Sequence, residues 1–459
     1  MKPILIVSYH FPPASEVGGL RPTKFAQYLP AFGWDPYVLT VTPRPSQTHD
    51  ATRLRNIDPG HVIRTGVWPM PLRLFVNLKH SLIRRFSSPT SECETLSKRV
   101  ATQQNPDGGI VRGSRQIAMA KRLLNSIFEL PDPEVGWLLP ALVAGYRIIK
   151  MHRIQYILST SPPTTPTLIA LILSRLTRAH LIIDLRDPWN LHSAKPVEVR
   201  SALSDAIERW MEQRFMHSAH SVITTTTHYT EFLRRKYATI PQQKILTIPN
   251  GFDPSDYPLH SARPANEQCF VISYLGTFYL GRTPKNFLEA VGQLVAEQVI
   301  PKRQLRINLI GHVAHADGVP VADMSSRNGL LGCVTMRNPV PYAESLALMK
   351  DSDVLLLFAP NQYYAVPAKA YEYLGAKKPI LCFGNRGATA DLIREMGAGY
   401  VVADSDLEAI KVAVRDLYEA WRSNRSFCYT GDPSQYERHV LTRALVTRLE
   451  GTEYRASTQ

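Results

Sequence analysis

The sequence predicts an α/β fold in which two Rossmann-like, doubly wound domains face each other across a cleft. The chain has 459 residues, more than one hydrophobic core usually accommodates, so two domains are expected. It opens with a short apolar run, a glycine-containing loop, a helical stretch and a second apolar run, an order typical of a βαβ unit in a parallel sheet. A second α/β series follows a stretch rich in Pro, Asp and Ser near the middle of the chain.

The first domain is expected to span residues 1–258. Its βαβ unit consists of a strand at 4–7, a helix at about 21–31 and a strand at 37–41. Further strands are expected at 154–159, 180–185, 221–226 and 244–248, with helices at about 165–177 and 201–215. Because strands and helices alternate, ligands are expected at the carboxyl ends of the strands.

Residues from about 44 to 130 are rich in Pro, Ser and Arg and show no clear alternation, so we expect an insertion with one or two helices. Basic residues are interleaved with apolar ones over 72–86, among them Lys79, Arg84 and Arg85. This pattern is typical of a helix that lies on an anionic membrane surface. A solvated basic face on a helix packed against the core is the alternative.

The second domain is expected to span residues 268–430, after a linker at 252–268. Its strands are expected at 270–275, 306–310, 334–336, 354–358 and 380–383, and its helices at about 284–297, 345–349 and 368–375. Residues 431–459 are expected to contain a helix that packs back on the first domain. Asn250 and Gly251 are expected to form a tight turn at the hinge between the domains.

The formal net charge of +14 fits three kinds of partner: nucleic acid, an anionic membrane or negatively charged small substrates. No nucleic-acid-binding motif occurs, so no nucleic acid partner is expected. The five cysteines lack metal-ligand and disulfide spacing, and the acidic pair at 351–353 leads straight into an apolar strand, so no metal site is expected. The apolar runs are too short for a membrane span or a signal peptide, which predicts a cytoplasmic protein, with peripheral contact at the inner membrane face as an option.

Glycines after the first strand are candidates for binding a phosphate. Gly18 and Gly19 precede a helix, where the backbone of glycine approaches a phosphate closely and the first turn offers unpaired N–H groups. Arg21 lies in the first turn of that helix and is expected to add a cation. A plain turn with a surface arginine is the alternative.

Glu372 is the strongest single candidate, because it lies on a helix that follows the strand at 354–358. A carboxylate at this place can accept two hydrogen bonds from the vicinal hydroxyls of a nucleotide ribose. The N–H groups of Ala365 and Val366, before the helix, are expected to meet a diphosphate at its positive end, with Lys369 in the first turn. An exposed helical glutamate is the alternative.

Four short motifs occur in a characteristic order along the chain. They are FPP with GG at 11–19, SPP with DLRDPW at 161–189, IPNGFD at 248–253 and VPAKAYEYLGAKKPI at 366–380. Together they resemble the retaining GT-B glycosyltransferases, also called glycosyl transferase group 1. The resemblance covers most of the chain except residues 44–130.

The resemblance implies roles for residues of the second domain. The family pattern has two glutamates separated by seven residues, and Glu372 fits the second, which binds the ribose. Tyr364 stands where the first glutamate contacts the donor sugar, so this chain departs from the pattern there. Gly276, Thr277, Arg282 and Lys285 resemble the family's phosphate-binding segment, with Thr277 at the usual arginine position and Arg282 at the usual lysine position.

In the first domain, Arg186 and Asp187 follow the strand at 180–185. In the family this strand often ends in a histidine near the donor sugar, and Arg186 occupies roughly that place. Asp187 is a candidate to bind or deprotonate the acceptor hydroxyl. A turn with an N-cap is the alternative for this loop.

The resemblance implies transfer of a sugar from a UDP- or GDP-sugar to a hydroxyl of a lipid-linked or saccharide acceptor, in cell-surface polysaccharide or glycolipid synthesis. We expect retention of configuration and no metal or other cofactor, because protein cations and helix N-termini can take the place of Mg²⁺. Two alternatives stay open at this point. One is a nucleotide-sugar epimerase on the same scaffold, and the other is a non-catalytic, membrane-associated partner in polysaccharide assembly.

Overall fold

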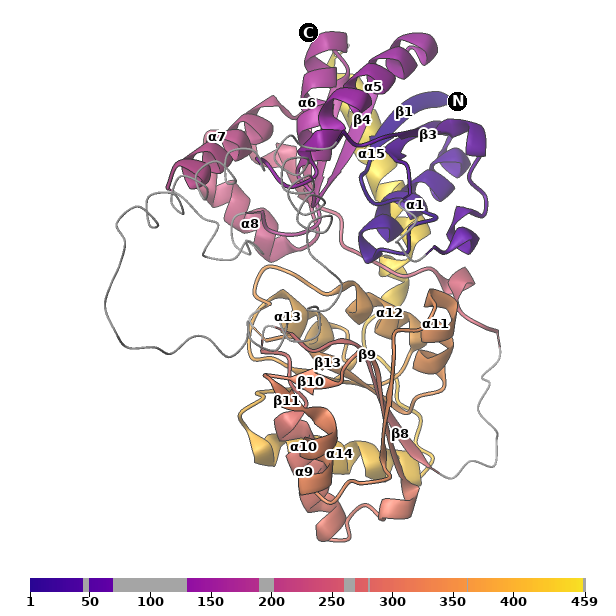
Figure 1. Ribbon diagram of the computed structural model, residues 1–459, viewed down its shortest axis with the longest axis vertical. Helices are drawn as coiled ribbons and strands as arrows, with labels where there is room; N and C mark the ends of the chain where they lie inside the picture. Colours follow the sequence, from indigo (N-terminus) through magenta and orange to yellow (C-terminus); the bar gives the residue numbers. More distant parts are fainter. Residues whose placement is uncertain are drawn as a thin grey trace, which may run out of the picture.

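The computed structural model describes residues 1–43, 49–68, 130–189, 202–259, 269–279, 281–360 and 362–456. These residues form two α/β domains stacked along the long axis of the molecule (Figure 1). Each domain is built on one parallel sheet, so the predicted two-domain α/β fold is confirmed.

The sheet of the first domain has seven strands in the order β3-β2-β1-β4-β5-β6-β7. Its order reverses between β1 and β4, which is the topological switch point of an open parallel sheet. The strands are β1 (Lys2–Val7), β2 (Trp34–Val41), β3 (Val62–Thr65), β4 (Tyr156–Ser161), β5 (His180–Leu185), β6 (Ser221–Thr224) and β7 (Ile245–Thr247). The helices are α1 (Leu20–Tyr28), α5 (Leu138–His152), α6 (Thr165–Thr177), α7 (Ala202–Ser218) and α8 (Thr227–Lys236).

The sheet of the second domain has six strands in the order β12-β9-β8-β13-β14-β15, with its switch point between β8 and β13. The strands are β8 (Phe270–Thr277), β9 (Leu305–His312), β12 (Val334–Arg337), β13 (Val354–Phe358), β14 (Ile380–Phe383) and β15 (Gly399–Val402). A small antiparallel pair, β10 (His315–Ala316) and β11 (Val319–Pro320), follows β9. The helices are α9 (Lys285–Ala296), α10 (Val321–Arg327), α11 (Tyr342–Lys350), α12 (Ala368–Ala376), α13 (Ala388–Glu395) and α14 (Leu407–Arg422).

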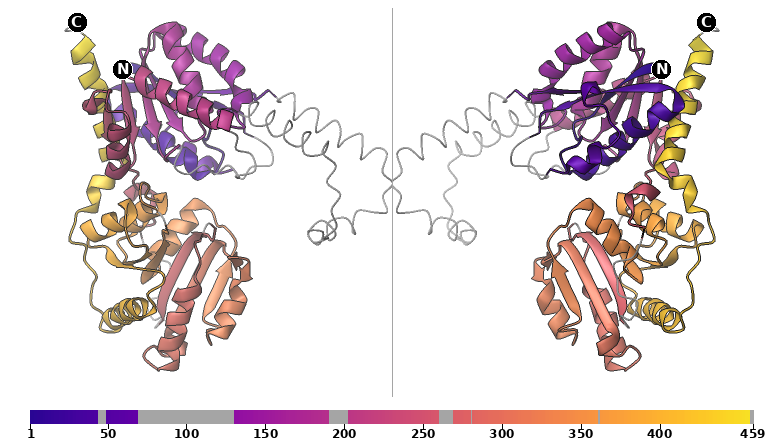
Figure 2. Two further views of the ribbon diagram at one scale, coloured as in Figure 1. Left: turned by 90° about the vertical axis from the view of Figure 1, so that its left-hand side faces the viewer. Right: turned by 90° about the vertical axis from the view of Figure 1, so that its right-hand side faces the viewer.

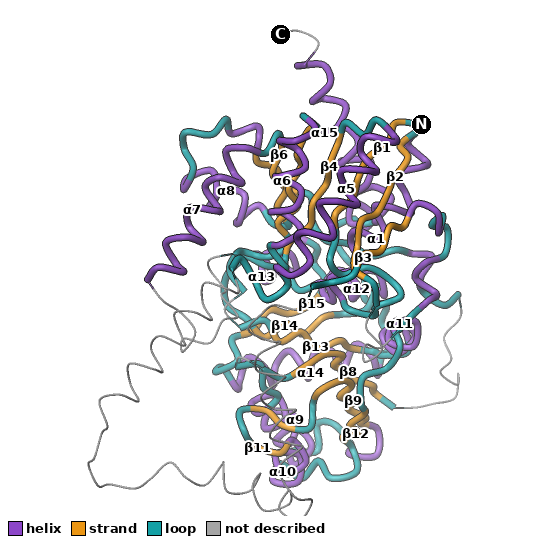
Figure 3. Tube along the Cα trace, turned by 45° about the horizontal axis from the view of Figure 1, so that its top comes forward, coloured by secondary structure: helices purple, strands orange, loops and turns teal. Residues whose placement is uncertain are grey.

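Each sheet is covered by helices on both faces. In β1, Leu5 and Val7 belong to the core that includes α5, α6, α7 and α8, whereas Ile4 and Ile6 belong to the core on the other face that includes α1, as the period of two in a strand requires. In the second domain α9, α10 and α14 cover one face, and α11, α12 and α13 cover the other. Helices α11, α12 and α13 lie on the side of the second domain that faces the first domain (Figures 1 and 3).

The last helix, α15 (Arg438–Ala456), begins at the second domain and packs against the first (Figure 2). Leu441, Leu445 and Leu449 repeat every four residues and therefore share one face of the helix. All three are buried in the core that contains Phe25 and Trp34. Part of the helical layer that contains α1 thus comes from the C-terminal end of the chain.

The chain crosses between the domains twice, and the two crossings are hydrogen-bonded to each other. The Phe252 amide donates to the Tyr436 carbonyl at 3.1 Å, and the Arg438 amide donates to the Phe252 carbonyl at 2.8 Å. A Cβ atom on Gly251 would lie 1.9 Å from the Tyr436 carbonyl oxygen, so only glycine fits at this close approach. The predicted turn at Asn250-Gly251 is therefore a point of contact between the crossings.

Several elements differ from the prediction. Strand β3 lies within the predicted insertion and β15 was not predicted, because both are only four residues long and lack a clear alternation. Helices α5, α8 and α10 were not predicted either. The stretch predicted as a linker is anchored at its start, since Phe252 and Tyr257 are buried and Lys24 forms ion pairs with Asp253 and Asp256. The basic segment 72–86 lies outside the described residues.

Candidate functional site

A cleft of about 2270 Å³ lies between the two domains. The carboxyl ends of β1, β4 and β5 in the first domain open into it, as do those of β8, β9 and β13 in the second. Both switch points therefore meet the same space, which is the usual place for a ligand in open α/β sheets. Residues at or just beyond these strand ends that line the cleft include His10, Pro162, Arg186, Thr277, His312 and Pro360.

The wall formed by the second domain carries two neighbouring cations, Lys369 and Arg282. The Lys369 ammonium donates to the Leu275 carbonyl at 2.7 Å, and a Cβ atom on Gly276 would lie 1.9 Å from its Nζ atom. Glycine at position 276 thus leaves room for the lysine. Burial lowers the pKa of Lys369 to about 8, and the nearby charge of Arg282 acts in the same direction.

These cations lie beside the N-terminus of α12. Ala365 and Val366 are buried residues that line the cleft just before the helix. Among the residues that the structure describes, none accepts a hydrogen bond from the amide N–H group of Ala365 or Val366. Thr277 also lines the cleft, and the Arg282 guanidinium lies over the Tyr279 ring at 4.5 Å. Unpaired N–H groups, a positive helix end and two cations together suit an anion.

Glu372 lies one turn further along α12, is 9% exposed and lines the cleft. Burial raises the pKa of its carboxyl group, and the charges of Lys369, Arg438 and Arg53 together with the nearby Tyr342 hydroxyl act against this increase. A buried carboxylate surrounded by cations from three elements and facing a cleft is suited to accept hydrogen bonds from a ligand.

Arg21 has a different role from the predicted one. It lines the cleft but is only 2% exposed, and it forms an ion pair with Asp184 at 2.9 Å. Its Nη2 atom also donates to the Ile248 carbonyl group at 2.9 Å, and its Nη1 atom donates to the Pro249 carbonyl group at 2.6 Å. Thr160 donates a further hydrogen bond to Asp184. Arg21 therefore joins α1, β5 and the first crossing, and its charge is compensated within the protein.

The glycine loop also differs from the prediction. The Arg186 guanidinium donates to the carbonyl groups of Gly18 and Pro162, and a Cβ atom on Gly18 would lie 2.8 Å from its Nη1 atom. Gly19 is buried against the His10 carbonyl group and does not line the cleft. The glycines thus make room for an arginine and a turn of the protein itself, not for an open phosphate site.

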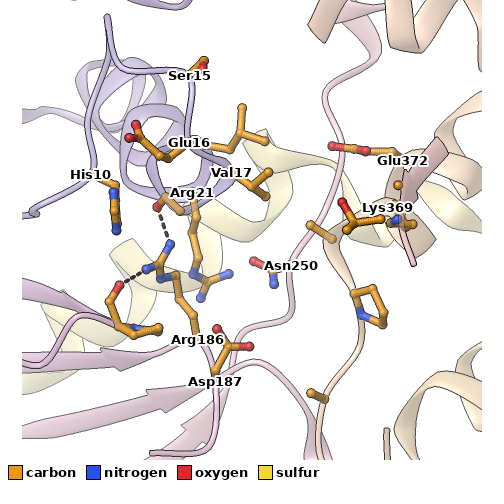
Figure 4. A pocket seen from close by; sticks show the side chains of 18 of the residues that line it. His10, Ser15, Glu16, Val17, Arg21, Arg186, Asp187, Asn250, Lys369 and Glu372 are labelled. Atoms are coloured by element: carbon orange, nitrogen blue, oxygen red, sulfur yellow. Dashed lines mark hydrogen bonds between the residues drawn. The ribbon is translucent and has the colours of Figure 1, made fainter. Parts of the chain in front are cut away.

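Figure 4 shows Arg21 and Arg186 on one side of the cleft and Lys369 and Glu372 on the other, with Asn250 between them. Asp187 lines the cleft on the side of the first domain and is exposed, so its carboxylate is accessible to a ligand. The structure does not bring Lys285 into the cleft. It is exposed in the first turn of α9, beyond the loop that carries Arg282.

Tyr364, at the position of the family's first glutamate, forms a contact between the domains. Its ring packs against Phe232 of α8 with centroids 5.1 Å apart, and its carbonyl group accepts a hydrogen bond from Thr226 at 2.6 Å. Nearby, His228 of α8 lies 3.0 Å from Asp391 of α13. The tyrosine side chain therefore holds the domains together on the side opposite the crossings and does not line the cleft.

Two residues that sequence reasoning missed also line the cleft. His10 lies three residues after the end of β1, and a polar residue just beyond the end of a strand is a signal that could have identified it. Burial and the charge of Arg186 lower the pKa of His10, while Glu16 and Glu134 act in the opposite direction. Arg438 lies at the start of α15, far from every motif in the sequence, and no local pattern marks it.

Comparison with known protein families shows to which family the chain belongs. The model of the glycosyl transferase 4-like domain matches residues 19–251, and the model of glycosyl transferases group 1 matches residues 269–420. The chain belongs to this glycosyltransferase family. The resemblance seen in the sequence is confirmed, and the enzyme is a glycosyltransferase with the GT-B fold. A comparison with curated proteins finds no match.

Solved structures support the fold of this glycosyltransferase. Sucrose-phosphate synthase from Thermosynechococcus elongatus is 15% identical, with a TM-score of 0.57, over 100% of this chain and 99% of the other. HepE from Anabaena in complex with UDP and glucose is 14% identical, with a TM-score of 0.55, over 98% and 100%. A putative UDP-N-acetylglucosamine 2-epimerase from Listeria monocytogenes is 12% identical, with a TM-score of 0.57, over 99% and 98%. At these identities the comparison shows a shared fold, which a synthase and a protein described as an epimerase have in common.

Two further findings concern the described part of this glycosyltransferase. None of its described helices has the length and apolar character needed to cross a bilayer. Within the same residues, no group of three or more His, Cys, Asp or Glu side chains comes together in a way that suits a metal ion.

Proposed function

We propose that this glycosyltransferase moves a sugar from a UDP- or GDP-sugar to an acceptor hydroxyl with retention of configuration. The observation that carries the proposal is the second-domain wall, where Lys369, Arg282 and the N-terminus of α12 lie beside the buried Glu372. The cations and N–H groups suit a diphosphate, and the carboxylate suits the two ribose hydroxyls. The complex of HepE with UDP and glucose, which shares the fold, supports this class of donor.

The roles follow from the positions of the side chains. As the bond from the anomeric carbon to the diphosphate oxygen breaks, negative charge grows on the leaving group and is stabilised by Arg282 and Lys369. Because the configuration is retained, the new bond to the acceptor oxygen forms on the face of the anomeric carbon that the diphosphate leaves, and the hydroxyl proton passes to Asp187, which is exposed on the first-domain side of the cleft. Fixed protein charges act on the diphosphate in place of a divalent metal ion.

Incubation with labelled UDP- and GDP-sugars and with saccharide and lipid-linked acceptors tests the proposal. We expect a glycosylated product whose anomeric configuration, read by NMR, matches that of the donor, and whose yield is unchanged by EDTA. An isomerised nucleotide sugar without transfer would identify an epimerase, and binding without either reaction would favour an assembly partner. Loss of all activity with EDTA, restored by Mg²⁺ or Mn²⁺, would contradict the metal-independent mechanism.

Replacing Arg282 with alanine is expected to lower turnover more than it raises the KM for the donor. The reason is that the charge on the leaving diphosphate develops in the transition state, where a guanidinium stabilises it most. Loss of one such donor is expected to cost about 10²–10³-fold in kcat. Steady-state kinetics measures the effect, with Lys285→Ala, a cation outside the cleft, as the matched control. If Arg282→Ala loses no more turnover than Lys285→Ala, Arg282 acts only as a surface charge.

We also propose that the first domain contacts an anionic membrane, which would bring it to a lipid-linked acceptor. Helices α5 and α6 pack together and contain no acidic residue. On α5 a stripe of exposed apolar side chains runs along one face, and on α6 Leu176 is 60% exposed. Exposed cations flank them, namely Arg147, Lys150, Arg153, Arg175 and Arg178. A surface that combines apolar side chains with cations and lacks acidic residues is suited to contact an anionic leaflet.

The triple variant Arg147→Glu, Lys150→Glu and Arg153→Glu is expected to bind anionic vesicles at least about hundredfold more weakly than the parent, because each cation contributes about 1 kcal/mol. Co-sedimentation with phosphatidylglycerol vesicles at low salt measures this, and high salt should weaken binding by the parent. The control reverses three exposed cations of the second domain, Lys302, Arg303 and Arg327. Equal binding by both variants, or none by the parent, would contradict the membrane contact.

A further inference from the structure

The loop that joins β13 to α12 presents two consecutive peptide groups to the cleft. The Ala365 N–H belongs to the same peptide group as the Tyr364 carbonyl, and the Val366 N–H shares its peptide group with the Ala365 carbonyl. A trans peptide is planar, and its carbonyl and N–H point in opposite directions. Whatever holds the two carbonyl groups therefore also fixes the directions of the two N–H groups.

Two threonine hydroxyls hold these carbonyl groups. Thr226 Oγ1 donates to the Tyr364 carbonyl at 2.6 Å, and Thr389 Oγ1 donates to the Ala365 carbonyl at 2.9 Å. Both threonines are buried, and neither lines the cleft. The N–H groups of Ala365 and Val366 are thus turned away from the threonines, and the described residues offer them no acceptor. Two adjacent N–H groups with fixed directions suit an anion.

The two threonines come from different domains. Thr226 is the N-cap residue of α8 in the first domain, whereas Thr389 lies in the first turn of α13 in the second. The Tyr364 ring packs against Phe232 of the same helix α8, with centroids 5.1 Å apart, which keeps the loop beside Thr226. The direction of one of the two N–H groups therefore depends on where the first domain lies.

We propose that Thr226 is a positioning residue of the donor site, which directs the Ala365 N–H at the diphosphate from the first domain, while Thr389 directs the Val366 N–H from the second. This inference rests on the diphosphate-binding role of the second-domain wall proposed above. Donors that are oriented before the ligand arrives need no reorganisation when it binds. The diphosphate site is thus built on the second domain but completed by a hydroxyl of the first.

The test is calorimetry of UDP, uridine and pyrophosphate binding to the full chain. Thr226→Val removes the hydroxyl with little change in volume and is expected to weaken binding of UDP and pyrophosphate about tenfold, because a hydrogen bond to a charged group is lost or misdirected. Uridine lacks the diphosphate and should bind as it does to the parent. Thr389→Val should show the same pattern, since it releases the neighbouring peptide group.

Matched controls separate this role from a structural one. The Thr226 hydroxyl also accepts a hydrogen bond from the Tyr229 amide at 3.1 Å, which caps α8. Thr226→Ser keeps both hydrogen bonds and should bind all three ligands like the parent. Asp406→Ala removes the cap of α14, a helix whose N-terminus lies outside the cleft, and should also leave the three affinities unchanged.

A measurement on the parent does not depend on the folding of a variant. In protein labelled with ¹⁵N at alanine and valine, pyrophosphate should shift the amide signals of Ala365 and Val366, and the absence of both shifts would overturn the inference. Equal losses for uridine and UDP in folded Thr226→Val, no loss, or the same loss in Thr226→Ser would also overturn it. If the folded parent binds neither UDP nor GDP, the proposed function itself fails.

Discussion

Replacing Asp184 with alanine is expected to lower the free energy of unfolding by about 3–5 kcal/mol, because the change leaves Arg21 charged and buried without its partner. The carboxylate also accepts a hydrogen bond from Thr160, which would be left without an acceptor. A loss of this size is a large share of the 5–15 kcal/mol that typically stabilises a domain. We therefore expect the first domain to unfold at a much lower temperature and urea concentration than in the parent.

Thermal and urea unfolding followed by circular dichroism measures this effect. Asp187→Ala serves as the matched control, because it removes an exposed carboxylate three residues away and should change stability by less than about 1 kcal/mol. Arg21→Met combined with Asp184→Leu should recover much of the loss, since a well-packed apolar pair avoids the cost of a buried single charge. If Asp184→Ala unfolds at the same temperature and urea concentration as Asp187→Ala, the buried ion pair does not stabilise the fold.

Replacing Glu372 with alanine is expected to weaken nucleotide binding about ten- to hundredfold, which corresponds to about 1.5–3 kcal/mol for a lost charge-assisted hydrogen-bond pair. The fold should survive, because the carboxylate lines the cleft and removing it also removes a buried charge. Lys369 and the N-terminus of α12 would remain in place for the diphosphate, so the loss should fall on the nucleoside part of the ligand.

Calorimetry with UDP, GDP and free pyrophosphate distinguishes these contributions. The affinity for the nucleotides should fall, whereas the affinity for pyrophosphate should be unchanged or rise, because a negative charge near the cations has been removed. Glu419→Ala, on the exposed side of α14, makes the same change of charge away from the cleft and is the control. Unchanged nucleotide affinity in Glu372→Ala would remove this residue from the site.

The sequence was most informative where elements are continuous and buried. The strands at 180–185 and 354–358 and the helix at 165–177 were predicted with the bounds that the structure has, because each is a mostly apolar run between polar or turn residues. Strand β3 has four residues, all partly exposed, and its pairing with β2 is set by tertiary contacts. Such an edge strand leaves little pattern in the sequence.

The candidate site was predicted in part for a similar reason. Glu372 and Lys369 follow a buried strand, and the position of that strand brings them to the cleft. Arg21 and Gly18 were also placed beside the cleft, but their partners were not foreseen, because Asp184 and Arg186 lie more than 160 residues away in the sequence. A local motif shows that a charge is present and does not show which distant group compensates it. Arg438 is a similar case, since only the path of α15 brings it to the cleft.

The position of α15 affects the order in which the two domains can complete their folding during synthesis on the ribosome. The first domain begins the chain, yet the face of its sheet around Ile4 and Trp34 is closed by Leu441, Leu445 and Leu449. Domains generally fold as units in the order of their synthesis. Here the N-terminal domain exposes an apolar sheet face until translation of the second domain is complete, so the domain that is made first is the one that is finished last.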